Sequence, residues 1–243
     1  MGGPELLPHS PIGPEIRSRG VRSPRSHFDQ QLQHLQDELL ILASVIDKAI
    51  DRAVESLKQR DRAASERVIR DDLTINEKRF EIEERALILL ATHQPMARDL
   101  RIIASVIHIV TDLERMGDHA EGIARISLLH VDQPLLKPLI DVPRMADLCR
   151  DMLRRSMDAF IARDAEAAKL IAAEDDQVDQ LYDQVYHELV MFMISDPKTI
   201  ERATWLLWTA HNLERIADRV TNICERVVFL VTGRMEEMNV SKY

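Results

Sequence analysis

Apolar residues recur along most of this chain at alternating steps of three and four, which is the spacing of one face of an α-helix. The clearest run covers residues 28–53, with apolar positions at Phe28, Leu32, Leu35, Leu39, Leu42, Ile46, Ala49 and Ala53. Similar runs cover about 61–91, 95–130, 143–163, 164–194 and 197–232. Aromatic residues make up only 4% of the chain, and its many Ala, Leu, Glu, Arg and Met residues favour helices over strands. The pattern therefore predicts an all-α protein.

Prolines divide these runs from one another. Beyond residue 26 they stand at the joints between runs, where a ring that clashes with a helix interior is tolerated; they are Pro95, Pro134, Pro138, Pro143 and Pro197. Asp61 or a neighbouring residue is expected to cap the second helix. Residues 1–26 hold four of the seven glycines and five of the ten prolines and show no apolar period. We therefore expect a disordered N-terminal tail.

The chain contains an internal repeat of about one hundred residues. Asp112-Leu-Glu-Arg-Met-Gly-Asp118 returns as Asn212-Leu-Glu-Arg-Ile-Ala-Asp218, and residues 60–64 correspond to residues 163–167. The repeat predicts two tandem, pseudo-symmetric three-helix bundles, at 27–132 and 141–234, followed by a short tail at 235–243. Helices of about thirty residues are about 45 Å long, so an elongated molecule is expected.

Composition and charge exclude several classes of protein. The net charge of −9 argues against a general nucleic-acid binder, which needs a basic surface for phosphate contacts. No apolar run is long enough to cross a membrane, and the N-terminus lacks the apolar core of a secretion signal. Cys149 and Cys224 are too few for a zinc cluster or a disulfide framework. We therefore expect a cytoplasmic protein.

The two halves of the repeat match most closely at two pairs of carboxylates. Glu114 and Asp118 in the first half, like Glu214 and Asp218 in the second, stand four residues apart on one helical face. Glu121 extends the first pair by another turn. Like charges at this spacing repel, and an oxygen-rich face of this kind binds hard or borderline cations such as Mg²⁺, Mn²⁺ or iron.

The alternative is a solvated acidic surface whose charge Arg115, Arg215 or Arg219 offsets. The occurrence of the pair at equivalent places in both halves favours the functional interpretation.

Motifs of catalysis are missing. The sequence has no Gly-rich phosphate loop, no Gly-x-Ser-x-Gly elbow, no His-Glu-x-x-His, and none of the Glu-x-x-His pairs that mark di-metal bundles. His119 and His187 are expected to be structural or exposed. An apolar group is interpreted as core, namely Met191, Phe192, Met193, Trp205 and Trp208. The sequence predicts that the protein is not an enzyme.

The motifs together resemble those of the PhoU family of phosphate-specific transport system accessory proteins. The likeness rests on both Leu-Glu-Arg motifs, on Gln94-Pro-x-x-x-Asp-Leu-Arg101 and on Asn222-Ile-Cys-Glu225, and it extends over residues 27 to about 234. Asn212, in the place of Asp112, departs from the first copy. We expect it to make the second acidic face slightly less charged.

The resemblance implies a cytoplasmic homodimer that represses the phosphate-starvation response and modulates high-affinity phosphate uptake. Its implied partners are the ATPase subunit of the phosphate ABC transporter and a sensor histidine kinase. It also implies divalent or multinuclear metal ions (iron, zinc, manganese or magnesium) held by Glu114, Asp118, Glu214 and Asp218. A weaker match extends to Glu121, Asp72, Asn76, Glu83, Asp175 and Asp179.

Two other functions remain open at this point. One is an accessory protein of a low-affinity phosphate permease, which shares the helical architecture. The other is a metal-storage or metal-dependent hydrolytic bundle that uses the same carboxylates.

Overall fold

The computed structural model describes residues 24–238, so residues 1–23 of the predicted N-terminal tail and residues 239–243 lie outside the described residues. The described part is all-α, as predicted, and contains no strand. Its elements are α1 (Pro24–Gln59), α2 (Arg62–His93), α3 (Arg98–His130), α4 (Asp141–Ala162), α5 (Ala165–Ala172), α6 (Asp175–Ser195), the short 3-10 helix η1 (Pro197–Thr199) and α7 (Ile200–Thr232).

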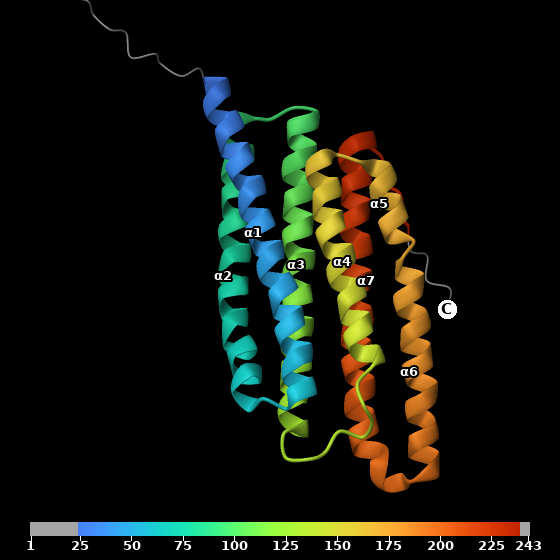
Figure 1. The fold of residues 1–243 in the computed structure, drawn as a ribbon. Coiled ribbons are helices and arrows are strands. Elements are labelled where there is room, and N and C mark those ends of the chain that lie inside the picture. Colours follow the sequence, from blue (N-terminus) through green and yellow to red (C-terminus); the bar gives the residue numbers. More distant parts are fainter. Residues whose placement is uncertain (1–23, 239–243) are drawn as a thin grey trace, which may run out of the picture.

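The helices lie nearly parallel to one long axis, so the molecule is elongated (Figure 1). α1, α2 and α3 form one side, and α4 to α7 form the other. α3 packs against α7, and α1 packs against α4, so the two sides share long contacts. The buried apolar residues of all seven α-helices form one continuous core. The molecule is therefore one extended bundle built from two three-helix layouts.

The sequence accounts for the ends of several helices. The Asp61 carboxylate accepts a hydrogen bond from the Ala64 N–H at 3.0 Å, and the Asp164 carboxylate does the same for the Ala167 N–H at 2.9 Å. Both carboxylates satisfy amides that a helix start leaves without a partner. α7 ends at Thr232, and the next residue, Gly233, caps it with a φ of 73°, a backbone conformation that glycine adopts at little cost.

Three predicted boundaries differ from the structure. α1 begins at Pro24, so residues 24–26 are helical and do not belong to a tail. α4 begins at Asp141, which places Pro143 in the first turn, where a missing N–H breaks no helical hydrogen bond. α3 begins only at Arg98, because Ala97 has a left-handed φ of 48°.

The predicted helix over 164–194 is broken in the structure. α5 ends at Ala172, and α6 begins at Asp175 after a turn in which the Glu174 N–H donates to the Ile171 carbonyl at 3.0 Å. The Glu174 carboxylate is held by the Arg155 guanidinium, with one contact at 2.9 Å. No Gly or Pro marks this break in the sequence, so the apolar period gives no sign of it.

The predicted aromatic and Met core is only partly correct. Trp205 is half-buried and packs edge-on against His130, with ring centroids 5.0 Å apart, and Met193 packs against the core. Met191 and Trp208, however, are 61% and 52% exposed. Met191 follows the buried Leu189 by two residues and is therefore turned about 200° away from it. The core prediction is wrong for these two residues.

Candidate functional site

The first acidic face combines residues of α2 and α3. α3 contributes Glu114, Asp118 and Glu121, and α2 contributes the buried Asp72. One oxygen of Asp72, Oδ2, accepts a hydrogen bond from Asn76 Nδ2 at 3.0 Å. The other, Oδ1, is shielded from solvent and has no hydrogen-bond partner in the described part of the chain. A buried carboxylate oxygen without a donor is costly and calls for a ligand or a proton.

The charges on this face act on one another. Burial, followed by the carboxylates of Asp118, Glu121 and Glu114, raises the pKa of Asp72 to about 6. The pKa of Glu114 is also raised, first by burial and then by Asp118. The four predicted carboxylates are therefore close enough to disfavour simultaneous ionisation.

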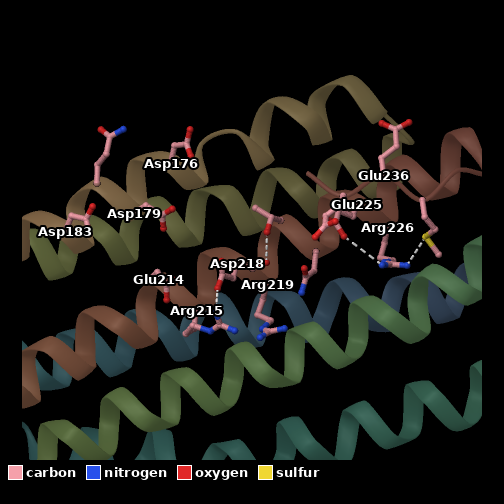
Figure 2. A pocket seen from close by; sticks show the side chains of 15 residues that line it. Asp176, Asp179, Asp183, Glu214, Arg215, Asp218, Arg219, Glu225, Arg226 and Glu236 are labelled. Atoms are coloured by element: carbon pink, nitrogen blue, oxygen red, sulfur yellow. Dashed lines mark hydrogen bonds and ion pairs between the residues drawn. The ribbon is translucent and has the colours of Figure 1, made fainter. Parts of the chain in front are cut away.

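The second acidic face lies between α6 and α7 and borders an open pocket of about 930 Å³. Figure 2 shows Asp179 and Asp183 of α6 on one side and Glu214 and Asp218 of α7 on the other. Asp175 is buried at the start of α6. This face repeats the arrangement of the first one, because Asp175 stands in the second half where Asp72 stands in the first.

The electrostatics repeat as well. Burial and then the charges of Asp179, Asp218 and Glu214 raise the pKa of Asp175 to about 7. Burial and then Asp218 raise the pKa of Glu214 to about 7, against a lowering effect of Arg215. Two faces with the same charge pattern thus occur in the described structure, one in each half.

Arginines offset part of this charge. Arg215 pairs with Asp218 at 2.6 Å, Arg125 pairs with Glu121 at 2.5 Å, and Arg79 pairs with Glu83 at 3.1 Å. These pairs are the charge compensation that a purely solvated acidic surface would show. They leave Asp72 and Glu114 without an ion pair to another described residue.

Neither face is a preformed metal-binding shell. Among residues 24–238 no three His, Cys, Asp or Glu side chains converge on a point where one ion would contact them all. A cation at either face requires side chains to rotate toward it, and Arg215 or Arg125 to release its carboxylate. The donors themselves are oxygen atoms, which match Mg²⁺, Mn²⁺ and iron better than zinc.

The seam between the halves explains why the repeat differs at its first residue. The buried Asp112 accepts a hydrogen bond from Asn222 Nδ2 at 3.1 Å, and Arg219 lies 3.6 Å from it. In the mirrored position, Asn212 Oδ1 lies 3.0 Å from Nδ1 of His119. An aspartate thus faces an arginine on one side of the α3–α7 crossing, and an amide faces an imidazole on the other.

Asn212 therefore belongs to the seam, and the expectation that it lowers the charge of the second acidic face is wrong. Gly122 leaves room for it, because a Cβ at Gly122 would lie only 3.2 Å from Asn212 Oδ1. His119 is structural, as predicted. Burial lowers its pKa, so the neutral imidazole fits its contact with the amide.

The sequence interpretation missed His211. Its Nδ1 lies 3.3 Å from Glu214 Oε2 on the second face, and its ring lies 6.2 Å from that of Tyr182. The signal was present, because His211 precedes Glu214 by three residues, which is the reverse of the Glu-x-x-His order that di-metal bundles use. His187 is exposed and hydrogen-bonds to the Asp183 carbonyl within α6.

Comparison with known proteins gives the family. A family model described as the PhoU domain matches residues 39–127 and again residues 142–227, one match in each half. The chain belongs to the PhoU family. A PhoU homologue of Aquifex aeolicus, named as a phosphate-specific transport system accessory protein, is 37% identical over 85% of this chain and 93% of its own. A homologue of the same name from Clostridium acetobutylicum is 36% identical over 88% of this chain and 99% of its own.

Solved PhoU structures have the same fold. The crystal structure of PhoU from Pseudomonas aeruginosa is similar with a TM-score of 0.81 at 33% identity, covering 85% of this chain and all of that one. The structure described as the phosphate transport system regulatory protein PhoU from Streptococcus pneumoniae has a TM-score of 0.80 at 34% identity, covering 86% and 99%. The helical packing of this chain is therefore that of the PhoU family.

Proposed function

We propose that this protein is an accessory protein of phosphate-specific transport that represses the phosphate-starvation response. The observation that carries the proposal is the pair of equivalent carboxylate faces in a PhoU-family chain. The names of its relatives, which describe accessory proteins of phosphate-specific transport, support the same role. The protein acts by binding partners and not by catalysis.

Each acidic face takes up divalent cations in this account. Glu114 and Asp118, with Asp72 and Glu121, hold the cation in the first half; Glu214 and Asp218, with Asp175, hold it in the second. A bound cation neutralises the carboxylates and offers open coordination positions to acidic or phosphorylated groups of a partner. The unpartnered Oδ1 of Asp72 and the raised pKa of Asp175 fit this use, because both groups gain from a nearby positive charge.

The partners are the ATPase subunit of the phosphate ABC transporter and the sensor histidine kinase of the phosphate response. In this role the chain is a rigid adaptor in the cytoplasm and works as a homodimer. No helix of the described part is long and apolar enough to cross a membrane. Contact with the membrane-bound transport system would then pass through protein partners.

Calorimetry with the purified protein tests the adaptor role. The ATPase subunit and the cytoplasmic part of the kinase are titrated separately, each with and without Mn²⁺. We expect both to bind, and the affinity of at least one to rise with Mn²⁺. If neither binds under either condition, the adaptor role is wrong.

A further inference from the structure

α2 carries an exposed apolar stripe in addition to its buried face. Leu73, Phe80 and Leu87 are spaced by seven residues and are 69%, 59% and 58% exposed. Residues seven apart drift by only about 20° around a helix, so the three side chains form one line about 21 Å long. We call this line the outer stripe of α2.

The outer stripe is distinct from the face that holds α2 in the bundle. The buried residues Val68, Ile75, Ile82 and Leu89 also repeat every seven residues. They precede the outer stripe by five residues, which is about 140° around the helix. α2 is therefore apolar on two faces, and packing against α1 and α3 uses only one of them.

Carboxylates stand between the apolar residues of the outer stripe. Glu77 and Glu84 are exposed and also lie seven residues apart, and Glu81 is exposed beside them. None of the three forms an ion pair with another described residue. The nearby arginines are engaged elsewhere, since Arg79 pairs with Glu83 and stacks over the Phe80 ring at 4.9 Å, and Arg85 pairs with Glu38. Lys78, next to Glu77, also forms no ion pair with another described residue, so the stripe combines an apolar line with three unpaired carboxylates against one unpaired cation.

The fold does not require this stripe. In the second half, Asp176 and Asp183 occupy the positions that correspond to Leu73 and Phe80, and both are exposed; only the position of Leu87 keeps an apolar residue, the half-buried Val190. The buried positions, in contrast, are kept apolar, as Ile171, Val178 and Val185. Apolar residues on the outer face of the first half are therefore an addition to the shared architecture.

We propose that the outer stripe of α2 binds an amphipathic helix of a partner protein, with apolar residues every seven positions and Lys or Arg between them. A seven-residue period is that of paired helices, in which apolar knobs fill holes and flanking charges select the partner. The basic residues of such a helix meet Glu77 and Glu84. This proposal rests on the adaptor role proposed above and specifies one of its contact surfaces.

A second copy of the chain fits the outer stripe poorly. Pairing about a twofold axis at Phe80 sets Leu73 of one copy against Leu87 of the other. The same axis brings Glu77 of one copy beside Glu84 of the other, and like charges across an interface oppose association. The charge pattern therefore favours a basic partner over self-association.

The direct test uses a synthetic helix of three heptads with Leu at positions a and d and Lys at e and g, labelled for fluorescence anisotropy. The full-length protein should bind this Lys helix more tightly than the same helix with Glu at e and g. Phe80→Ala with Leu87→Ala should weaken binding by about tenfold or more, because two apolar anchors are lost. Met191→Ala with Ile194→Ala, which removes exposed apolar side chains from α6, should leave binding unchanged.

A charge exchange makes the test specific. Glu77→Lys with Glu84→Lys should transfer the preference to the Glu helix, whereas Asp158→Lys with Glu201→Lys, elsewhere on the surface, should not. Equal affinity of all these variants for the Lys helix would overturn the proposal. A gain in affinity for the Lys helix on deletion of residues 1–23 would also overturn it, because the chain's own N-terminal segment would then occupy the stripe. A dimer that dissociates only in the Phe80→Ala, Leu87→Ala variant would overturn it as well, because the stripe would then bind a second copy of the chain.

The adaptor role and the docking site on the outer stripe of α2 can be contradicted independently of each other. If the transporter ATPase and the kinase bind the Phe80→Ala, Leu87→Ala variant as tightly as the wild type, the outer stripe is not their docking site and the adaptor role stands. If neither binds the wild type, the adaptor role itself is wrong.

Discussion

At the scale of single residues, two buried carboxylates destabilise the fold when they are ionised. Asp72 and Asp175 occupy equivalent places in α2 and α6, and both have a pKa raised well above that of an exposed aspartate. Burial and neighbouring carboxylates cause the shift in each case. Such groups lower the free energy of unfolding when ionised, and they gain from a proton or a cation.

A pH series tests this cost. A raised folded-state pKa means that the folded protein binds protons more tightly than the unfolded chain, so each group destabilises the fold fully above its folded pKa. The destabilisation declines as pH falls from the folded pKa to the unfolded pKa of about 4. We expect Asp72→Asn with Asp175→Asn to raise the free energy of unfolding by about 2 kcal/mol at pH 8 without metal. This gain should shrink steadily as pH falls below 7 and reach near zero only below about pH 4, where the unfolded chain is protonated too, and chemical denaturation at each pH measures it.

The comparison with the wild type removes other titrations from the result. His119, His130 and His211 have lowered pKa values because of burial, and they oppose stability as pH falls. They are present in both proteins and cancel. Asp158→Asn, on the exposed side of α4, serves as the control variant. A constant difference between pH 8 and pH 5 would contradict the assignment.

At the scale of helices, most elements follow from the apolar period, because one stripe of each helix has to be buried. The stripe of α1 is buried from Phe28 to Ala53 apart from the half-buried Ala49, and Asp61 caps α2 as the sequence indicates. The break between α5 and α6 could not be predicted, since no Gly or Pro marks it in the sequence. The partners of Asp112 and Asn212 were equally hidden, because a contact between α3 and α7 leaves no periodic signal.

At the crossing of α3 and α7, we expect substitution of two asparagines to lower the free energy of unfolding by different amounts. Asn222→Ala removes a hydrogen bond to the buried Asp112 carboxylate, and should lower the free energy of unfolding by about 1 to 3 kcal/mol. Asn212→Ala removes a contact with a neutral imidazole and should cost about 1 kcal/mol. Urea denaturation compares them. In a protein that already carries Asp112→Asn, the substitution Asn222→Ala should lower the free energy of unfolding by less. An unchanged loss in that protein would argue against the hydrogen bond between Asn222 and Asp112.

The acidic faces give a prediction about metal. Calorimetry with Mn²⁺ should detect binding to the wild-type protein. Asp118→Asn and Asp218→Asn should each remove part of this binding, and the double variant should not bind Mn²⁺. The helical circular dichroism signal should stay intact, because relief of like-charge repulsion does not harm either helix. Metal removal with a chelator should lower the melting temperature of the wild type but not that of the double variant. Equal Mn²⁺ stoichiometry in all four proteins would reject these faces as metal sites.

At the scale of the whole molecule, the duplication sets two similar faces on one rigid bundle with a single core. The carboxylates of each face could be predicted from the sequence, because the i, i+4 spacing fixes their common side. The spacing alone does not place Asp72 of α2 and Asp175 of α6 beside them; in the sequence only the family resemblance indicated these two residues. The outer stripe of α2 breaks the symmetry of the two halves, and it gives the first half a surface that the second half lacks.

The most direct test of the account is alkaline phosphatase activity, a product of the phosphate-starvation response, in phosphate-rich cells that lack this gene and any second copy of it. The account predicts high activity in the deletion strain, low activity after return of the wild-type gene, and high activity after return of the Asp118→Asn, Asp218→Asn variant at equal protein level. Low activity in the deletion strain itself would contradict a repressor of the phosphate response.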